Sequence, residues 1–439
     1  MKTTLPVEGA TRAPKIVPFR GLLYHQEKAG DPSRFVAPPY DVISPTQQER
    51  LYARDPHNVV RLILGKQHPE DTEQENRYTR AAADLKKWIQ EGVLVRDEKP
   101  ALYLYEQEFV LQGKKRKRRG LITLRRLEDF GQSIHRHEKT LEGPKRDRFQ
   151  LITHCHANLS PIFSLYEDPQ KEVVSLLDPH YKTAPFLEVV DDDQTFHRLW
   201  RLTESALLKK VSERLAAKGM FIADGHHRYE IGLAYRDWMK KKYPEAGDQA
   251  PFYYIMMFCA EISDPGLIIL PTHRLVLRPN LDSTTLISRL RERFKVHSFS
   301  KERLGLFLQD FGAKADRRGF GVVLGQEATP YHFIELPPSD LLDVQSVHQS
   351  VLREILGFTE EDEKNPERIA YVKDQQELLS LVEREPDDFG ILLSAPSPAE
   401  VFRVAQKGTV LPPKSTYFFP KLLSGLVFNP IDPEEEVII

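Results

Sequence analysis

One run of five residues carries the most distinctive chemistry in this chain: Asp224, Gly225, His226, His227 and Arg228. The arginine fork suits phosphate or carboxylate, and each imidazole can exchange a proton, donate a hydrogen bond or bind a metal. Glycine lets the backbone take a positive φ and gives a ligand room to approach. The alternative is that the aspartate only caps a helix and that both histidines lie on the surface. We interpret the run as an anion-binding site, because residues of these types stand together.

Apolar spacing predicts the elements that position this run. Residues 220–223 are apolar and predict a buried strand that stops at the run. Apolar residues then return at Ile231, Ala234, Tyr235 and Trp238, which is the spacing of a helix that buries one face. The start of a helix has unpaired backbone N–H groups and partial positive charge, which attract anions. The run is therefore expected at the N-terminus of a helix.

Two earlier segments offer further polar groups. Residues 37–45 include three prolines, which forbid a helix and hold Tyr40 and Asp41 on a rigid loop. These two residues form the wall of a ligand site, or else the tyrosine packs and the aspartate makes a local turn bond. Residues 58–64 predict a strand that carries Arg61. A guanidinium inside such a strand needs a buried partner or an anionic ligand.

Residues 135–148 are too polar for a core and are rich in reactive side chains. Lys145 and Arg148 are suited to phosphate groups, and Glu138 is suited to remove a proton from a hydroxyl. The alternative is a charged surface loop with local ion pairs. Composition by itself favours the loop, whereas a family resemblance described below favours the site.

A second cationic residue also follows apolar strands. Residues 252–261 and 267–270 predict two buried strands joined by a turn, and they lead to His273 and Arg274. We expect these side chains to reach the same pocket as the central run. The alternative is that the arginine pairs with an acidic neighbour.

Six consecutive basic residues, 114–119, lie between two alternating segments, 101–111 and 120–127. A hairpin with an exposed basic tip is the simplest interpretation. A basic run of this kind also suits nucleic acid, but no other dense basic patch accompanies it. We therefore expect a solvated tip and no nucleic-acid partner.

Composition limits the class of protein. The 439 residues suffice for two or three domains, and the net charge of −2 gives no general attraction to nucleic acid or acidic membranes. Cys155 and Cys259 cannot form a disulfide framework, and the longest apolar run, residues 252–260, is too short to cross a bilayer. We expect a cytoplasmic protein with no membrane partner. The common phosphate-loop, Rossmann, nucleophile-elbow and HExxH motifs are absent from the sequence.

The character of the chain changes past residue 279. A helix over residues 283–294, strands over 320–336 and a second helix over 346–356 predict a separate α+β lobe. In the tail, Lys414, Ser415 and Thr416 close over a ligand, or the aromatic tail packs on the core. The expected division is a mobile N-terminus at residues 1–14, a core at 15–278 with an insertion at about 67–200, and a lobe at 279–439.

Residues 222–230, with the sequence IADGHHRYE, resemble the phosphate-binding element of the ParB-like and sulfiredoxin-like superfamily. Some members of that superfamily are nucleotide-dependent kinases of free serine. From about residue 17 onward, the chain is similar to an uncharacterised bacterial and archaeal family, domain-of-unknown-function family ten-fifteen. The segments that carry this similarity are residues 37–44, 58–63, 137–140, 143–145, 157–163, 271–274 and 413–417.

The resemblance implies a fold, a ligand and a reaction. The fold is α/β (α+β), with a ParB/sulfiredoxin-like mixed-sheet core in residues 15–278. ATP or ADP, with Mg²⁺, binds, and phosphate passes to a small hydroxyl compound such as free serine. Glu138, or failing it Asp41, is the general base, and His227 also takes part. The residues expected to hold the nucleotide are Asp224, Gly225, His226, His227, Arg228, Lys145, Arg148 and Arg274.

Two other functions stay open beside the kinase. One is a nucleotide-binding switch without catalysis, and the other is a nucleic-acid-binding regulator that uses residues 114–119. A bound transition metal is a further possibility, because six histidines lie in the segments of interest. Three of them fall outside the pattern of the resembling family, so we predict no resident transition metal. The six are His135, His137, His154, His156, His226 and His227.

Overall fold

The computed structural model describes residues 13–138, 140, 142–312, 318–325 and 327–437. These residues form two compact units. The first unit comprises Met1–Arg136, Thr140–Leu267 and Pro420–Ile439, and the second comprises His137–Lys139 and Ile268–Phe419. The boundary between these units lies at Leu267, whereas the sequence suggested a domain boundary at residue 278. The domain division itself stays a prediction. Most of the N-terminus expected to be mobile lies outside the described residues.

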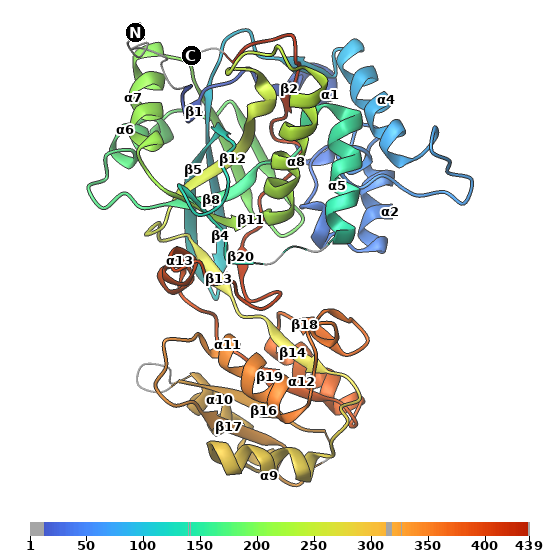
Figure 1. The fold of residues 1–439 in the computed structure, drawn as a ribbon, viewed down its shortest axis with the longest axis vertical. Coiled ribbons are helices and arrows are strands. Elements are labelled where there is room, and N and C mark those ends of the chain that lie inside the picture. The colour runs from blue at the N-terminus through green and yellow to red at the C-terminus, as the bar shows by residue number, and fades with distance from the viewer. Residues whose placement is uncertain (1–12, 139, 141, 313–317, 326, 438–439) are drawn as a thin grey trace, which may run out of the picture. The chain divides into compact units, whose positions relative to one another are not determined.

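The first unit is built on a nine-stranded mixed sheet, in the order β6-β11-β8-β12-β5-β4-β10-β9, with β1 paired to β5 (Figure 1). The pairs β6–β11 and β8–β12 are parallel, and the other pairs are antiparallel. This mixed sheet with its helices confirms the predicted α/β class. The strands are β1 Ile16–Val17, β4 Leu102–Leu111, β5 Lys114–Arg126, β6 Ile134–His135, β8 Ile162–Tyr166, β9 Leu187–Val190, β10 Phe196–Leu202, β11 Met220–Asp224 and β12 Tyr254–Glu261.

Helices lie on both sides of this sheet, with α6 and α7 on one side and α5 and α8 on the other (Figure 1). Helices α5 and α8 bury a shared apolar cluster that includes Ile152, Ile231 and Tyr235. Two small sheets complete the unit, β2 Leu22–Tyr24 with β3 Leu94–Arg96 and β7 Ala157–Asn158 with β21 Asn429–Pro430. The helices are α1 Gln26–Ala29, α2 Pro45–Arg54, α3 Val60–Ile63, α4 Arg77–Gln90, α5 Glu142–Cys155, α6 Val174–Leu177, α7 Ser205–Ala216 and α8 His226–Lys242.

The strand predicted over residues 58–64 is wrong, because this segment forms the short helix α3. The side chain of Asn58 accepts a hydrogen bond from the backbone N–H of Val60 at 2.9 Å, which fixes a turn before the helix. Arg61 then lies over the ring of Tyr52, 4.4 Å from its centroid, and donates to the carbonyl of that residue. Local capping therefore outweighed the β-branched composition that suggested a strand.

The second unit contains a six-stranded antiparallel sheet, in the order β15-β17-β16-β19-β14-β18. The two strands predicted over residues 252–261 and 267–270, with the turn between them, are present as β12 and β13, but they do not pair with each other: β12 lies in the nine-stranded sheet and β13 pairs with β20. The strands are β13 Ile268–Leu270, β14 His273–Val276, β15 Lys295–Phe299, β16 Gly319–Val323, β17 Tyr331–Glu335, β18 Ile369–Val372, β19 Phe389–Leu392 and β20 Tyr417–Phe419. The helices are α9 Ser283–Arg293, α10 Leu304–Gly312, α11 Asp343–Val347, the π-helical stretch His348–Ile355, α12 Gln375–Arg384 and α13 Pro398–Gln406.

None of the helices in the described segments has both the length and the apolar character that crossing a membrane requires.

Candidate functional site

The predicted strand, turn and helix are present at the central run, where β11 ends at Asp224 and α8 begins at His226. Gly225 joins them with a φ of 92°, a left-handed conformation that side chains other than glycine rarely adopt. A Cβ at this position would lie 2.8 Å from Nη2 of Arg228. The glycine is therefore required both by the backbone conformation and by the close approach of the guanidinium.

Asp224 does not cap the helix; its carboxylate lies between two cations. Oδ1 accepts a hydrogen bond from Nζ of Lys421 at 2.6 Å, and Oδ2 accepts one from Nη2 of Arg228 at 3.1 Å. Burial would raise the pKa of Asp224, but the two cations outweigh it and hold the pKa well below its ordinary value. The carboxylate is thus charged and fixes the guanidinium of Arg228.

The C-terminal segment that supplies Lys421 is held on the sheet by residues of the basic run and its partner strand. Arg118 is fully buried and donates to the carbonyl of Pro420 and to Oε1 of Gln107. Gln107 in turn donates to the carbonyl of Lys421 at 2.8 Å. Lys421 could not be identified from the sequence, because no spacing relates it to Asp224, about two hundred residues earlier.

The hairpin predicted around residues 114–119 is present, and Lys114, Lys115 and Lys117 are exposed, but the basic residues belong to strand β5 and not to the turn, and Arg118 is buried. The turn of the hairpin is only Gln112 and Gly113, both at positive φ. Acidic residues of the neighbouring strand β4 neutralise much of the run: Glu108 lies 3.0 Å from Lys117, and Glu106 lies 2.7 Å from Arg119. The run is therefore part of the sheet, and three of its six basic side chains are paired with carboxylates of β4.

Arg228 also borders a small cavity of about 60 Å³. Its Nη1 donates to the carbonyl of Pro161 at 2.5 Å. The cavity brings together residues from segments that the sequence analysis treated separately, because Tyr40, Arg148 and Ser160 line it as well. The guanidinium is thus engaged by protein groups on two sides while it still faces a cavity.

Tyr40 lies against one of the two arginines of this cavity. The guanidinium carbon of Arg148 is 3.9 Å from the centroid of the Tyr40 ring. Burial raises the pKa of Tyr40 to about 12, although the charges of Arg148 and Arg228 act in the opposite direction. The hydroxyl therefore stays protonated at neutral pH and can donate a hydrogen bond to an anion. Asp41, its neighbour, is exposed.

Arg148 is held in place by two protein groups. Its Nε donates to Oδ2 of Asp147 at 2.6 Å, and its Nη1 donates to the carbonyl of Ile63 at 2.7 Å. Residues 142–155 form helix α5, so this arginine and Lys145 lie on a helix and not on the loop that composition suggested.

Lys145 is engaged by carboxylates in this structure. Its Nζ lies 2.8 Å from Oε2 of Glu230 and 2.9 Å from Oε1 of Glu142. Glu230 also accepts from Oγ1 of Thr140 at 2.6 Å and from Nη1 of Arg136 at 2.8 Å. Glu230 therefore joins Arg136, Thr140 and Lys145 to α8. Sequence reasoning missed this role, although the residue ends the central motif.

The two histidines of the run differ in exposure. His226 is buried, with an exposed fraction of 4%, so the alternative of two surface histidines does not hold for it. His227 is partly exposed. Among the residues that the structure describes, no group of three or more histidine, cysteine or acidic side chains is arranged to hold a metal ion.

Glu138 and its neighbour His137 lie in the second unit, beside the C-terminal tail. Nε2 of His137 lies 2.8 Å from Oγ1 of Thr416, and the backbone N–H of Leu411 donates to the carbonyl of His137 at 2.7 Å. The backbone N–H of Lys414 lies 3.5 Å from Oε1 of Glu138. Lys414 has a positive φ of 55°, and its side chain is exposed.

Arg274 also lies in the second unit and is fully buried. It donates to the carbonyl of Thr272, and its Nε lies 3.3 Å from Nε2 of His348. Nδ1 of that histidine lies 3.1 Å from Oε2 of Glu363. The acidic neighbour considered as an alternative is thus reached through an imidazole. That Arg274 and Glu138 serve the same site as Arg228 stays a prediction.

Among the solved structures similar to this chain are three with low sequence identity. A conserved hypothetical protein from Pyrococcus furiosus is 16% identical, with a TM-score of 0.33, covering 66% of this chain and 89% of that protein. A free serine kinase in complex with AMP is 13% identical, with a TM-score of 0.33 and coverage of 65% and 83%. C-terminally truncated SbnI from Staphylococcus aureus is 10% identical, with a TM-score of 0.37 and coverage of 72% and 91%.

No curated protein matches the chain. The sequence profile of the family described as protein of unknown function (DUF1015) matches residues 16–377, most of the chain. This match confirms the family predicted from the motifs. The chain belongs to the DUF1015 family.

Proposed function

We propose that the chain binds a nucleotide through its phosphate groups at the junction of β11 and α8, and transfers a phosphoryl group to a small hydroxyl compound, for which free serine is the candidate. One observation carries the proposal: Arg228 and Arg148 line the same cavity as Tyr40, whose ring packs against Arg148. None of the described residues that line the cavity is acidic. Two guanidinium groups with a protonated phenol favour an anion there.

The size of the cavity restricts which part of the ligand enters. Its volume of about 60 Å³ is far below the roughly 300 Å³ at which pockets for whole organic ligands begin. A phosphate group is small enough for such a space, whereas a nucleoside is not. We therefore place the phosphate end against Arg228 and Arg148 and the nucleoside outside the cavity.

The proposed reaction rests on positioning and positive charge. A base takes the proton of the acceptor hydroxyl, the oxygen forms a bond to the terminal phosphorus, and the bridging P–O bond breaks to release a nucleotide with one phosphate fewer. Arg228 and Arg148 oppose the charge on the transferred group. Glu138 and Asp41 are the two candidate bases, and His227 is the further catalytic candidate at the start of α8.

Mg²⁺ was expected with the nucleotide, and the residues of the junction do not fit it as a resident ion. A bound Mg²⁺ needs one or two carboxylates. Both oxygens of Asp224, the carboxylate at this junction, face cations already, Lys421 on one side and Arg228 on the other. The steps above therefore depend on the arginines.

Calorimetric titration of the full chain with ATP, ADP and CTP tests the proposed site. Arg228→Ala is expected to weaken the tightest-binding nucleotide by at least about tenfold, because it removes charge-assisted hydrogen bonds. Arg236→Ala is the matched control, since Arg236 lies on the same helix and pairs with Asp237 and Asp129. An unchanged dissociation constant in Arg228→Ala would reject the site.

Detection of phosphoserine by mass spectrometry, after incubation with nucleotide and serine, tests the reaction. Glu138→Gln and Asp41→Asn distinguish the bases, because the variant of the true base loses turnover while nucleotide affinity is kept. Nucleotide binding without transfer to any hydroxyl acceptor would reject the kinase and leave a nucleotide-binding switch.

A further inference from the structure

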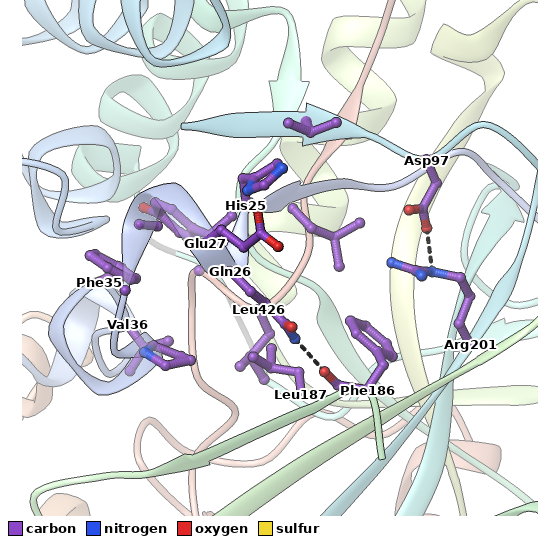
Figure 2. Close-up of a pocket in the computed structure, with 17 residues that line it drawn as sticks. His25, Gln26, Glu27, Phe35, Val36, Asp97, Phe186, Leu187, Arg201 and Leu426 are labelled. Atoms are coloured by element: carbon purple, nitrogen blue, oxygen red, sulfur yellow. Dashed lines mark hydrogen bonds and ion pairs between the residues drawn. The ribbon is translucent and has the colours of Figure 1, made fainter. Parts of the chain in front are cut away.

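A second cavity in the first unit, of about 400 Å³, takes no part in the proposed reaction (Figure 2). Its volume lies within the range of about 300 to 1,000 Å³ that small-molecule sites occupy. Most of its wall is apolar and comes from four separate stretches of the chain. The main apolar side chains are Leu23, Phe35, Val36, Phe186, Leu187 and Leu426. An apolar molecule, or the apolar body of a larger one, is the occupant that such a wall favours.

One side of this cavity carries a guanidinium held in a fixed orientation (Figure 2). Nε of Arg201 lies 2.8 Å from Oδ2 of Asp97, and its guanidinium carbon lies 4.4 Å from the centroid of the Phe186 ring. In the described parts of the chain, the terminal nitrogens Nη1 and Nη2 have no hydrogen-bond partner. This planar fork is therefore preorganised for a carboxylate.

Asp97 offers a complementary acceptor next to that fork. Its Oδ2 accepts from the hydroxyl of Tyr103 at 2.6 Å and faces Nε of Arg201, which fixes the carboxylate. Its Oδ1 makes no hydrogen bond to any residue that the structure describes. A carboxylate oxygen of this kind suits an ammonium group. The fork and the acceptor together suit a ligand with both charges.

The remaining polar groups lie around the mouth and along the N-terminal segment. Nδ1 of His25 is buried and has no hydrogen-bond partner within the described chain. Gln26 donates from its side chain to the carbonyl of Phe186, so it bridges two walls of the cavity (Figure 2). The acidic side chains Asp97 and Glu27 outnumber the single arginine of the lining. A ligand with only a carboxylate would add to this excess of negative charge, whereas a zwitterion would not.

We propose that this cavity binds a free α-amino acid with an apolar side chain. The carboxylate of the amino acid pairs with the fork of Arg201, and its ammonium group donates to Oδ1 of Asp97. The side chain lies among Phe35, Val36 and Leu426, which Figure 2 shows on the side away from the ion pair. This site is separate from the junction of β11 and α8, and it does not depend on the proposed reaction.

Calorimetric titration of the full chain with leucine and with phenylalanine, without nucleotide, tests this proposal. Three comparison ligands define what the site requires: glycine lacks the apolar side chain, phenethylamine lacks the carboxylate, and 3-phenylpropionate lacks the ammonium. We expect leucine or phenylalanine to bind at least about tenfold more tightly than each of the three. No binding of any apolar amino acid up to 10 mM, or equal binding of 3-phenylpropionate, would overturn the proposal.

Arg201→Gln assigns the binding to this cavity, with Arg214→Gln as the control. Arg214 lies in the same unit, is half exposed and pairs with Glu172 at 2.9 Å, away from the cavity lining. We expect Arg201→Gln to weaken the amino acid at least about tenfold and Arg214→Gln to leave it unchanged, with both variants folded by circular dichroism. Arg201→Lys, which keeps the charge and loses the fork, is expected to bind weakly too. Unchanged affinity in folded Arg201→Gln would place the ligand elsewhere and overturn the proposal.

Discussion

Each unit contains a charged group that the sequence marked for function, partly buried Asp224 in the first and fully buried Arg274 in the second, and the two are stabilised in different ways. In the first unit, Asp224 lies directly between Lys421 and Arg228. In the second unit, Arg274 makes no ion pair within the described residues and reaches a carboxylate only through the imidazole of His348. Lys421 and Arg228 both depend on the charge of Asp224. The contact between Arg274 and Glu363 instead runs through the imidazole of His348, so it is sensitive to protonation of that imidazole.

The two groups also differ in what their burial does: Asp224 orients another side chain, whereas Arg274 carries an unfavourable free energy of charge burial. Asp224 orients a guanidinium that borders a cavity, so its ion pairs serve the geometry of a candidate site. Burial lowers the pKa of Arg274 to about 10, which shows that its surroundings do not favour the charge. A buried ion that is satisfied mainly by neutral groups contributes little to net stability. The two regions should therefore respond very differently to loss of charge.

Removal of the directly paired carboxylate should have the largest effect. Asp224→Ala leaves Lys421 and Arg228 close together without their anion. Breaking a fully buried pair costs about 3 to 5 kcal/mol, and because these three side chains are partly exposed we expect a loss near the lower end of that range. Urea unfolding followed by tryptophan fluorescence measures the loss, because Trp88, Trp200 and Trp238 all lie in the first unit.

The matched change in the second unit is Arg274→Met, which keeps the length of the side chain and removes its charge. It leaves backbone carbonyls without a donor, so we expect a loss of about 1 to 3 kcal/mol, smaller than that of Asp224→Ala. Hydrogen exchange of second-unit peptides reads it out. A loss as large as that of the aspartate variant would contradict the contrast between direct and indirect pairing.

Mild acid should also destabilise the second unit. Burial lowers the pKa values of His273, His332 and His348 to about 4 from an ordinary value near 6.5. Between these values the unfolded chain binds more protons than the folded one, so stability is present above about pH 6.5 and falls toward pH 4. Each imidazole contributes roughly 3 kcal/mol at most.

Hydrogen exchange of second-unit peptides at pH values between 7 and 4, corrected for the intrinsic exchange rate, measures this loss. Protection that stayed constant down to pH 4 would show that these histidines are not buried in their neutral form. His332→Asn removes one titrating group and should flatten part of the dependence.

Substitution of the junction glycine should cost less, about 1 to 2 kcal/mol. Gly225→Ala places a methyl group 2.8 Å from Nη2 of Arg228 and strains a backbone with a φ of 92°. Gly30→Ala is the control, because its φ is also positive, at 80°, and a Cβ there would meet no atom within 4 Å. Thermal unfolding gives the strain from both variants. Nucleotide titration should show weaker binding only in Gly225→Ala. Equal nucleotide affinity of both variants would mean that the guanidinium of Arg228 does not contact the nucleotide.

The sequence predicted the parts of the fold that depend on local pattern. The strand, turn and helix around Gly225 follow from apolar spacing and one glycine. The segment around Arg61 failed, because the capping bonds of Asn58 favour a helix that β-branched composition did not indicate. Local rules therefore work where spacing and capping agree.

Contacts between distant segments could not be predicted from the sequence. The basic run suggested an exposed tip, yet acidic residues on the neighbouring strand pair with it, and Arg118 lies at the centre of the sheet holding Pro420. Lys421 meets Asp224 only because the C-terminal segment returns to the first unit. No periodicity encodes such a return, so the ion pair between Lys421 and Asp224 could not be predicted.

The carboxylate of Glu230 provides the smallest test: it is directly paired and about as little exposed as Asp224, but one of its partners, Arg136, is exposed. Lys145, Thr140 and Arg136 converge on it. Glu230→Gln keeps the shape and removes the charge, and screening by solvent limits the expected loss to about 1 kcal/mol. Faster hydrogen exchange in peptides over residues 142–155 should report this loss, because α5 is then tied less firmly to α8.

The pH dependence of the same variant gives the sharper reading. Burial would raise the pKa of Glu230, but Lys145 and Thr140 outweigh it and lower the pKa, so its stabilisation is present above the unfolded pKa and disappears as the pH falls through the folded one. Wild type and Glu230→Gln should therefore differ at pH 7 and converge in acid. If the difference in stability between wild type and Glu230→Gln stayed constant with pH, the shape of the side chain, and not its charge, would hold Arg136, Thr140 and Lys145 to α8.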